Sequence, residues 1–518
     1  MDNLLAAIDL VMSWDVILVI IGSCVFGLFT GAMPGISATV AVALLVPITF
    51  FLSPVAALAS IATAVAIAIF AGDLPGGLLR IPGMPASAAY ADEAYAMTRQ
   101  GRGERALFTS LVCSVLGGLA GAAALSVSAP VLADFALEFQ YYEYFWLACI
   151  GLSTAAFVCA EQPVKGLVSL CIGLMLSTVG YDAISGIPRY TFGVFELMEG
   201  IHFIPAMIGV FAVGEVLRNL CHPSRGKLVE GPSERTPIRS VLATVFRNKA
   251  NVGRGSVLGI LIGALPGAGS DMAAWVSYAT AKRFSKQPQR FGTGYEEGII
   301  AASSSNNAAT CSTWIPSLVF GIPGDSVTAI VIGVLFLKGL EPGPTVFLEN
   351  APLVYSIFVA FFIANLILLP VGYLAIKTAK QLLRVPTDLL MPLILVFCTV
   401  GAFAINNSLM GVAVILCLGV ASFFMQENGF PVAPLILGMI MGDLLEENFM
   451  QAMIVANGDL TAFFGRPIAA MLGTLTILIW VLPLLGLGIS RVKKRAQRPA
   501  SSGNDGGEPA AARGETTS

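Results

Sequence analysis

Long apolar segments follow one another along nearly the whole chain, separated by short polar ones. In the first half they cover residues 14–33, 38–52, 54–71, 106–132, 141–160, 164–180 and 201–218. In the second half they cover residues 255–267, 270–281, 298–320, 327–339, 352–376, 388–405, 409–426, 431–442 and 467–490. A helix needs about 20 apolar residues to cross a bilayer, so we expect the shorter segments to form re-entrant hairpins or broken helices. The pattern predicts an all-α polytopic membrane protein with about 12 transmembrane helices.

A helix-breaking motif occurs once in each half of the chain. Residues 31–37 read Gly-Ala-Met-Pro-Gly-Ile-Ser, and residues 263–269 read Gly-Ala-Leu-Pro-Gly-Ala-Gly. Ile-Pro-Gly follows at 81–83 in the first half and at 322–324 in the second. Later landmarks keep the same order, with Pro205, Gly209 and Glu215 answered by Pro434, Gly438 and Asp443. This order predicts a first repeat at residues 1–218, a second at 255–466, and a final transmembrane helix at 467–490.

Charged residues are few and lie mostly between the apolar segments. They make up 12% of the chain, about half the share of a typical soluble protein. The net charge of −3 gives no reason to expect nucleic-acid binding. Lys and Arg are concentrated in the linker 219–254 and at the start of the tail 491–518. Loops rich in these residues stay in the cytoplasm, so both segments are predicted to be cytoplasmic, and the tail is predicted to be disordered.

The N-terminus has the opposite character. Its first 15 residues contain Asp2, Asp9 and Asp15 but no Lys or Arg. This predicts a periplasmic N-terminus and a first helix that is retained rather than removed as a signal peptide. The first half would then enter the membrane from outside and the second from inside. Two such halves form an inverted repeat, an architecture of secondary transporters whose binding sites lie between interrupted helices.

The interrupted helices are therefore the first candidates for a binding site. Pro removes a backbone hydrogen bond and Gly permits a sharp turn, so residues 33–39 and 265–271 should leave helix ends unpaired at membrane depth. Amides at a helix N-terminus attract anions, and unwound carbonyls can hold Na⁺. The alternative is a pair of structural kinks, but the duplication of the feature favours a site.

The two Ile-Pro-Gly segments read as hairpin tips, and Arg80 directly precedes the first of them. An Arg in an apolar region is costly unless it is paired or hydrated, and a guanidinium can grip a carboxylate with two hydrogen bonds. Arg80 is therefore either a substrate ligand or an interfacial residue paired with Asp73, Asp92 or Glu93.

A membrane-length segment of the second half is unusually polar, with the sequence Ala-Ala-Ser-Ser-Ser-Asn-Asn-Ala-Ala-Thr at 301–310. Small residues let helices pack closely, which accounts for the Ala and Ser residues. It does not account for Asn306 and Asn307, whose amides both donate and accept hydrogen bonds and suit carboxylate oxygens or Na⁺. Glu215 and Asp443 match each other in the two halves and are either interfacial acids or coupling residues.

These features define the candidate site. The predicted substrate-binding residues are Pro34, Gly35, Ser37, Arg80, Pro82, Gly83, Pro266, Gly267, Gly269, Ser270, Asn306, Asn307, Pro323 and Gly324. The predicted ion-binding residues are Ser37, Thr39, Asp271 and Asn306. No cofactor beyond a coupling ion and no resident metal is expected, because the nine cysteines form no CxxC pair and the two histidines lie apart.

The motifs resemble the large membrane subunit of the tripartite tricarboxylate transporter family. The resemblance is carried by residues 31–39, 47–50, 81–85, 263–269, 291–292, 297–298, 306–308, 321–324 and 339–344, and it extends over about residues 15–490. It implies a permease, not an enzyme, surrounded by the lipid of a bacterial inner membrane. Such a permease works with a small membrane subunit and a periplasmic solute-binding protein and imports carboxylates with a Na⁺ or H⁺ gradient. By analogy, its hairpin-bearing parts would move like an elevator.

The chain departs from the family pattern at two places. Ala302-Ser303 stands where many members have Pro-Glu, and Arg80 stands in the stretch before the first Ile-Pro-Gly. The substrate is therefore left open among tricarboxylates, dicarboxylates and aromatic carboxylates. A stand-alone carrier of the same fold is the alternative, and an intramembrane enzyme is a distant one. A homodimer is compatible with the sequence but not indicated by it.

Overall fold

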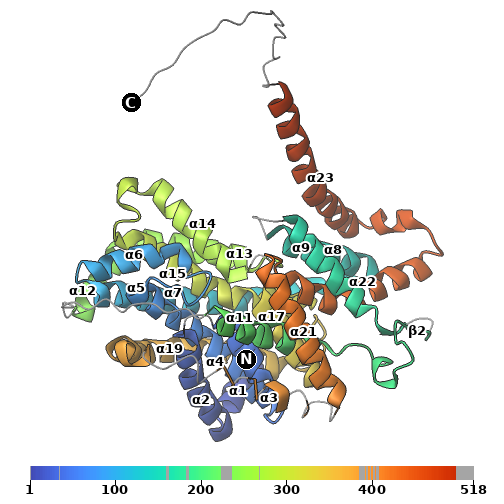
Figure 1. Cartoon of the computed structure of the whole chain (residues 1–518), viewed down its shortest axis with the longest axis horizontal. Coiled ribbons are helices and arrows are strands. Elements are labelled where there is room, and N and C mark those ends of the chain that lie inside the picture. Colours follow the sequence, from blue (N-terminus) through green and yellow to red (C-terminus); the bar gives the residue numbers. More distant parts are fainter. Residues whose placement is uncertain are drawn as a thin grey trace, which may run out of the picture.

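The protein is almost entirely helical (Figure 1). The computed structural model describes residues 2–33, 36–158, 163–182, 186–222, 236–267, 269–383 and 408–496, with a few more between 391 and 403. Within these residues, strands β1 (Gly180–Tyr181) and β2 (Pro188–Arg189) form one short antiparallel pair. The predicted all-α class is confirmed.

Six helices of the described part are long and apolar enough to cross a membrane. They are Trp14–Gly31, Pro54–Leu79, Gly103–Ala136, Phe203–Cys221, Ala351–Ala379 and Leu409–Glu427. Shorter apolar helices lie at Ala38–Thr49, Pro163–Ser177, Ser326–Leu337 and Pro467–Val481. A polytopic membrane protein follows from these lengths, while the expected total of about 12 crossings stays a prediction.

The helices follow the predicted apolar segments closely. The first half contains α1 (Asp2–Val11), α2 (Trp14–Gly31), α3 (Ala38–Thr49), α4 (Pro54–Ala71), α5 (Asp73–Leu79), α6 (Ala88–Arg99), α7 (Gly103–Ala136), α8 (Tyr141–Val158), α9 (Pro163–Ser177), η1 (Phe195–Leu197), α10 (Phe203–Met207), the π-helical turn η2 (Ile208–Val213) and α11 (Gly214–Cys221). The rest contains α12 (Ile238–Arg247), α13 (Lys249–Gly263), α14 (Gly269–Phe284), η3 (Pro288–Arg290), α15 (Glu296–Ser312), α16 (Trp314–Phe320), α17 (Ser326–Leu337), α18 (Val346–Glu349), α19 (Ala351–Leu382), α21 (Leu409–Glu427), α22 (Ala433–Val455), η4 (Leu460–Phe464) and α23 (Pro467–Ala496).

The two halves repeat the same order of elements. In each half a broken helix is followed by a long helix and, after one intervening residue, by a helix of seven residues: α4 precedes α5, and α15 precedes α16. Helix α2 packs on α4, and α13 packs on α15. Helix α19 of the second half covers α4, and α7 of the first half covers α15. The two halves thus share an order of elements and a pattern of contacts, while the inverted repeat stays a prediction.

Glycines bring the paired helices into close contact. A Cβ atom added at Gly31 would lie 2.4 Å from the carbonyl oxygen of Ala68 on α4. A Cβ added at Gly263 would lie 2.6 Å from the carbonyl oxygen of Ala309 on α15. No ordinary side chain fits such distances, so Gly at these two positions allows the backbones to approach as in other small-residue membrane contacts. The contacts hold the end of each broken helix against the long helix of its own half.

A second group of helices lies apart from these pairs. Figure 1 shows α8, α9, α22 and α23 gathered on one side of the molecule, and α22 packs against both α8 and α9. Between the groups, α10, η2 and α11 pack against α21. The repeat core with its helix breaks is thus bordered by a separate helical layer.

Two predicted boundaries differ from the structure. Part of the predicted linker 219–254 is helical, because α12 occupies Ile238–Arg247 and α13 begins at Lys249. Helix α12 buries Val241 and Val245 and packs on α7. The basic residues of this segment had led to the prediction of a loop. Helix α23 continues to Ala496 beyond the predicted end at 490, since Lys, Arg and Ala are good helix formers. Residues 223–235 and 497–518 lie outside the described residues.

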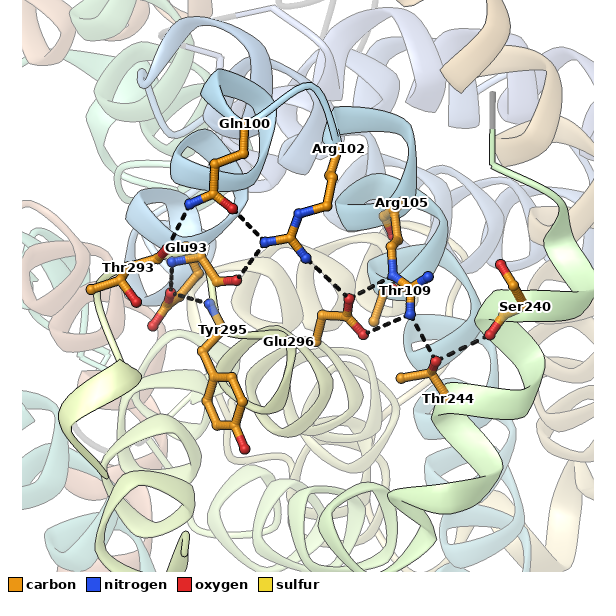
Figure 2. A network of polar contacts seen from close by, with 11 residues as sticks. Glu93, Gln100, Arg102, Arg105, Thr109, Ser240, Thr244, Thr293, Tyr295 and Glu296 are labelled. Atoms are coloured by element: carbon orange, nitrogen blue, oxygen red, sulfur yellow. Dashed lines mark hydrogen bonds and ion pairs between the residues drawn. The ribbon is translucent and has the colours of Figure 1, made fainter. Parts of the chain in front are cut away.

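Three polar segments meet in one network (Figure 2), and one of them, α12, belongs to the linker that was predicted to be cytoplasmic. Arg105 of α7 pairs with Glu296 of α15 at 2.6 Å and donates to the Thr244 hydroxyl of α12 at 2.9 Å. The Gln100 amide donates to the Thr293 carbonyl at 3.0 Å. The loop before α7, the loop before α15 and the helix α12 therefore lie together.

Candidate functional site

The hairpin tips have matching backbone geometry in the two halves. The amide of Ile81 donates to the Pro75 carbonyl at 3.4 Å, and the amide of Ile322 donates to the Pro316 carbonyl at 3.3 Å. Each preceding helix ends in a left-handed residue, with φ of 60° at Arg80 and 69° at Gly321. The sharp end of α5 and of α16 returns the chain toward the centre of the molecule, where the next helix begins.

The residues that follow these turns, Met84 to Ala86 and Asp325 to Val327, help to line a pocket of about 270 Å³. Its walls come from helix starts of both halves, from α15, and from the α11 and α21 layer. The lining residues with polar side chains are Ser37, Thr39, Glu215, Arg218, Ser270, Asp271, Asn306, Thr310, Thr313, Asp325, Ser326 and Gln426. Apolar side chains, among them Val65, Ile69, Met84 and Phe211, line the remainder. The pocket is therefore small, polar on several sides, and built from segments that are far apart in the sequence.

Three helices begin at this pocket. Residues from the first turns of α3, α14 and α17 line it, and these helices start at Ala38, Gly269 and Ser326. The Ser37 hydroxyl accepts from the Val40 amide at 3.3 Å, and the Thr39 and Ser326 hydroxyls are 2.8 Å apart, which joins the two halves across the pocket. Ser37 and Asp325 already accept from one amide each, that of Val40 on α3 and that of Thr328 on α17, and each helix N-terminus carries a partial positive charge. Their convergence favours an anionic group in the pocket.

Asn306 contributes an unused amide to the same pocket. Its side chain is 1% exposed, and neither its oxygen nor its nitrogen has a hydrogen-bond partner. Buried polar groups in folded proteins are nearly always hydrogen-bonded, because an unmade bond costs about 1–3 kcal/mol. An amide held unbonded at the wall of a pocket is suited to a ligand that supplies the partner.

Acidic groups also face the pocket, and one basic residue stands at its edge. The Asp271 carboxylate accepts from the Ala86 amide at 3.1 Å, and Asp325 caps α17 by accepting from the Thr328 amide at 2.8 Å. Glu215 lies on α11, where Arg218 approaches it at 3.8 Å. Arg218 is the one basic side chain among the described lining residues. The pocket can thus hold an anion at its helix starts and a cation beside its carboxylates.

The structure gathers only part of the predicted site. Ser37, Thr39, Ser270, Asp271 and Asn306 line the pocket. The predicted residues that stand behind the lining are Pro82, Gly83, Pro266, Gly267, Gly269, Asn307, Pro323 and Gly324. Several shape the turns: the Gly267 amide donates to the Pro323 carbonyl at 3.3 Å, and Gly269 adopts a φ of 69°. Pro34 and Gly35 lie outside the described residues.

Arg80 is placed away from the pocket. Its guanidinium pairs with Asp92 at 2.9 Å, and both side chains are mostly exposed, at 63% and 66%. It also lies over the Tyr95 ring, 5.9 Å from the ring centre. Of the two roles considered for Arg80, the geometry matches the paired residue at a helix end and not the substrate ligand.

Several lining residues were not singled out in the sequence. Thr310 lies one turn after Asn306, and this spacing of i and i+4 on one helix face was a usable signal. Asp325 and Ser326 directly follow the second Ile-Pro-Gly, so their position at a helix start was also readable. Arg218 and Gln426 come from α11 and the end of α21, and no local pattern connects those segments to the helix breaks.

No group of three or more His, Cys, Asp or Glu side chains suited to a metal ion is found among the described residues.

Comparison with known proteins agrees with the resemblance seen in the motifs. Residues 17–437 match the family model described as the tripartite tricarboxylate transporter TctA family. An uncharacterized 52.8 kDa protein in the TAR-I ttuC' 3' region of Agrobacterium vitis is 36% identical over 460 residues, covering 88% of this chain and 91% of the relative. An uncharacterized protein in the TAR-II ttuC' 3' region of the same organism is 38% identical over 227 residues, covering 44% of this chain and 94% of the relative. No solved structure matches the chain.

Proposed function

Because the chain belongs to the tripartite tricarboxylate transporter TctA family, we propose that it is the large permease subunit of an importer of small carboxylates. In this proposal a periplasmic solute-binding protein delivers the substrate, a small membrane subunit completes the complex, and a Na⁺ or H⁺ gradient drives uptake across a bacterial inner membrane. The N-terminus would be periplasmic and the C-terminus cytoplasmic. Membership of a transporter family favours this function over intramembrane enzyme chemistry.

The observation that carries the proposal is the convergence of three helix starts on the unbonded Asn306 amide. Helix N-termini supply free amide donors and partial positive charge, and the Asn306 amide can donate to a carboxylate oxygen. The pocket volume of about 270 Å³ is near the lower end of the roughly 300–1,000 Å³ usual for small-molecule sites. A small carboxylate therefore fits the pocket better than a peptide or a lipid does.

The charges around the pocket are compatible with an ion-coupled carrier. Arg218 is positioned to meet a second negative group of the substrate at the edge of the pocket. Asp271, Thr39 and Ser37 are proposed to hold the coupling ion together with Asn306, because carboxylate and hydroxyl oxygens suit a hard cation. Anion and cation would then occupy neighbouring positions and stabilise each other.

Reconstitution tests the function as a whole. The purified protein, the small membrane subunit and candidate binding proteins are placed in proteoliposomes, and uptake of a panel of labelled carboxylates is measured under Na⁺ or H⁺ gradients. We expect uptake that needs the binding protein. Undiminished uptake without it would favour the stand-alone carrier, and no uptake of any carboxylate under either gradient would contradict the proposal.

The role of the pocket is tested with Asn306→Ala. A hydrogen bond to a charged group contributes about 1.5–3 kcal/mol, so KM for the carboxylate should rise by about 10- to 150-fold. Asn448→Ala is the matched control, because the Asn448 amide donates to the Leu444 carbonyl on α22 and does not line the pocket. Equal KM values for the two variants would show that Asn306 does not contact the substrate.

A further inference from the structure

A carboxylate outside the pocket lining lies in the apolar interior. Asp73 begins α5 and is 4% exposed, within the membrane-length segment Pro54–Leu79. Among the described residues, no basic side chain pairs with it. An ionised carboxylate in such a place is costly unless something neutralises it. Asp73 therefore needs a proton, a cation or strong hydrogen bonds.

Two hydroxyl groups meet the two oxygens of this carboxylate. The Tyr90 hydroxyl of α6 donates to Oδ1 at 2.6 Å, and the Ser110 hydroxyl of α7 donates to Oδ2. Both hydroxyl groups act as donors here, so hydrogen bonds stabilise the negative charge on each oxygen of the carboxylate. The arrangement suits a group that alternates between an ionised form, held by two donors, and a protonated form that needs no counter-charge.

Among the described residues, no charged side chain on the surrounding helices is hydrogen-bonded or ion-paired with Asp73. Helices α4, α6 and α7 pack against α5, and α4 carries no titratable residue. The titratable residues on α6 and α7 are Tyr90, Asp92, Glu93, Tyr95, Arg99, Glu104, Arg105, Cys113 and Asp134. Glu93 accepts from the backbone amides of Gly294 and Tyr295, and Arg105 pairs with Glu296. Of the titratable residues on α6 and α7, Tyr90 is the one hydrogen-bonded to Asp73.

Tyr90 also connects this carboxylate to the pocket. The Tyr90 hydroxyl lies beside the Asn306 side chain, although the amide makes no hydrogen bond in this structure. Gly72, which directly precedes Asp73, packs against Met84 of the pocket wall, since a Cβ added at Gly72 would lie 2.5 Å from the Met84 Cγ atom. Tyr90 therefore lies between Asp73 and Asn306, whose amide is proposed to bind the substrate.

We propose that Asp73 binds and releases the proton that couples carboxylate import to a H⁺ gradient, an inference that rests on the proposed function for its transport role. When Asp73 is ionised, the Tyr90 hydrogen is committed to Oδ1. When the carboxylate takes up a proton, the new O–H of Asp73 donates to the Tyr90 oxygen, and the Tyr90 hydrogen becomes free to turn toward the Asn306 carbonyl. That hydrogen bond directs the amide N–H groups of Asn306 toward the substrate carboxylate. Release of the proton reverses the two hydrogen bonds.

Two measurements on the full protein test this proposal. Infrared difference spectroscopy during a pH titration of the purified protein follows the C=O stretch of a protonated carboxyl group, without any need for transport. Transport assays then compare concentrative uptake driven by a pH gradient with counterflow, in which labelled substrate exchanges at equal pH on both sides. The variants are Asp73→Asn, Tyr90→Phe and the control Asp92→Asn, whose carboxylate is exposed and paired with Arg80.

We expect Asp73→Asn to lose one titrating carboxyl band and to lose uptake driven by the pH gradient, while counterflow persists. Tyr90→Phe keeps the shape of the ring but removes a donor that favours the ionised carboxylate, so the band should shift to more alkaline pH. Because Phe cannot donate to Asn306, this variant should also show weaker uptake under the pH gradient. Persistence of the titrating band in Asp73→Asn, or full gradient-driven uptake by that variant, would overturn the proposal. If no carboxylate is transported by the unmodified protein, the proposed function fails, and the infrared result still decides whether Asp73 is a proton-binding group.

Discussion

The buried carboxylate of Glu93 allows a quantitative prediction about how the two halves are held together. Glu93 of α6 is 0% exposed and accepts four hydrogen bonds from the second half. The donors are the amides of Gly292, Gly294 (2.7 Å) and Tyr295 (2.8 Å) and the hydroxyl of Tyr278 (2.9 Å). Part of this arrangement is visible in Figure 2. Glu93 therefore fastens the first hairpin to the loop before α15.

Glu93→Gln keeps the size of the side chain but replaces one acceptor oxygen with an amide that faces donors. Each oxygen of Glu93 accepts two of the four bonds, so at least two are lost. Hydrogen bonds to a charged group contribute about 1.5–3 kcal/mol each, which gives a loss of about 3–6 kcal/mol. With an unfolding entropy of about 2.1 cal/mol/K per residue, the melting temperature of a chain of 518 residues should fall by roughly 3–6 °C.

Thermal unfolding in detergent, followed by tryptophan fluorescence, measures this loss. The control is Asp92→Asn, which neutralises the carboxylate of the preceding residue. The Asp92 side chain is 66% exposed and pairs only with Arg80 in the described structure. Exposed ion pairs contribute at most about 1 kcal/mol, so the control should melt close to the unmodified protein. If both variants melt at the same temperature, Glu93 does not join the halves in the way described.

The remaining predictions concern the glycine contacts and Arg80. Gly31→Ala or Gly263→Ala places a Cβ atom against a carbonyl oxygen and should destabilise the protein by about 1–3 kcal/mol. The control is Gly22→Ala on α2, whose Cβ atom meets nothing within 4 Å and which should be neutral in the same thermal assay. Equal effects at positions 22 and 31 would refute the close contact. Arg80→Gly keeps the left-handed turn but removes its steric cost, which is about 1–2 kcal/mol for a residue with a side chain. The stability of the protein should therefore hold or rise, and KM for the carboxylate should not change. A clear rise in KM would instead show that Arg80 contributes to substrate binding.

Much of the fold was readable because hydropathy and helix-breaking residues are local signals. The Pro-Gly breaks, the hairpin tips and the limits of most helices follow from short stretches of sequence. The helix starts then predicted Ser37, Thr39, Ser270 and Asp271 as pocket residues. Asn306 was predicted because a double Asn in a membrane-length segment calls for a polar partner.

The rest depended on which helix faces meet, and hydropathy does not contain that information. Arg218 and Gln426 reach the pocket only because α11 packs on α21. Arg80 sits in a motif next to the site, yet the left-handed turn points it to the surface, where it pairs with Asp92. Asp73 was considered only as a partner for Arg80, and its two hydroxyl partners come from α6 and α7.

The exchange of covering helices between the halves has a consequence for the order of synthesis. Helix α4 packs against α19, which is synthesised much later. One face of α4 is therefore exposed to lipid until α19 has been inserted. The segment Pro54–Leu79 tolerates this because its hydropathy is 2.3, and α4 itself contains no charged residue. The polar helix α15, with its serines and asparagines, is covered by α7, which is already in place when α15 emerges. The helix that is exposed to lipid for longer is thus the apolar α4, whereas the polar α15 can pack against α7 as soon as it is inserted.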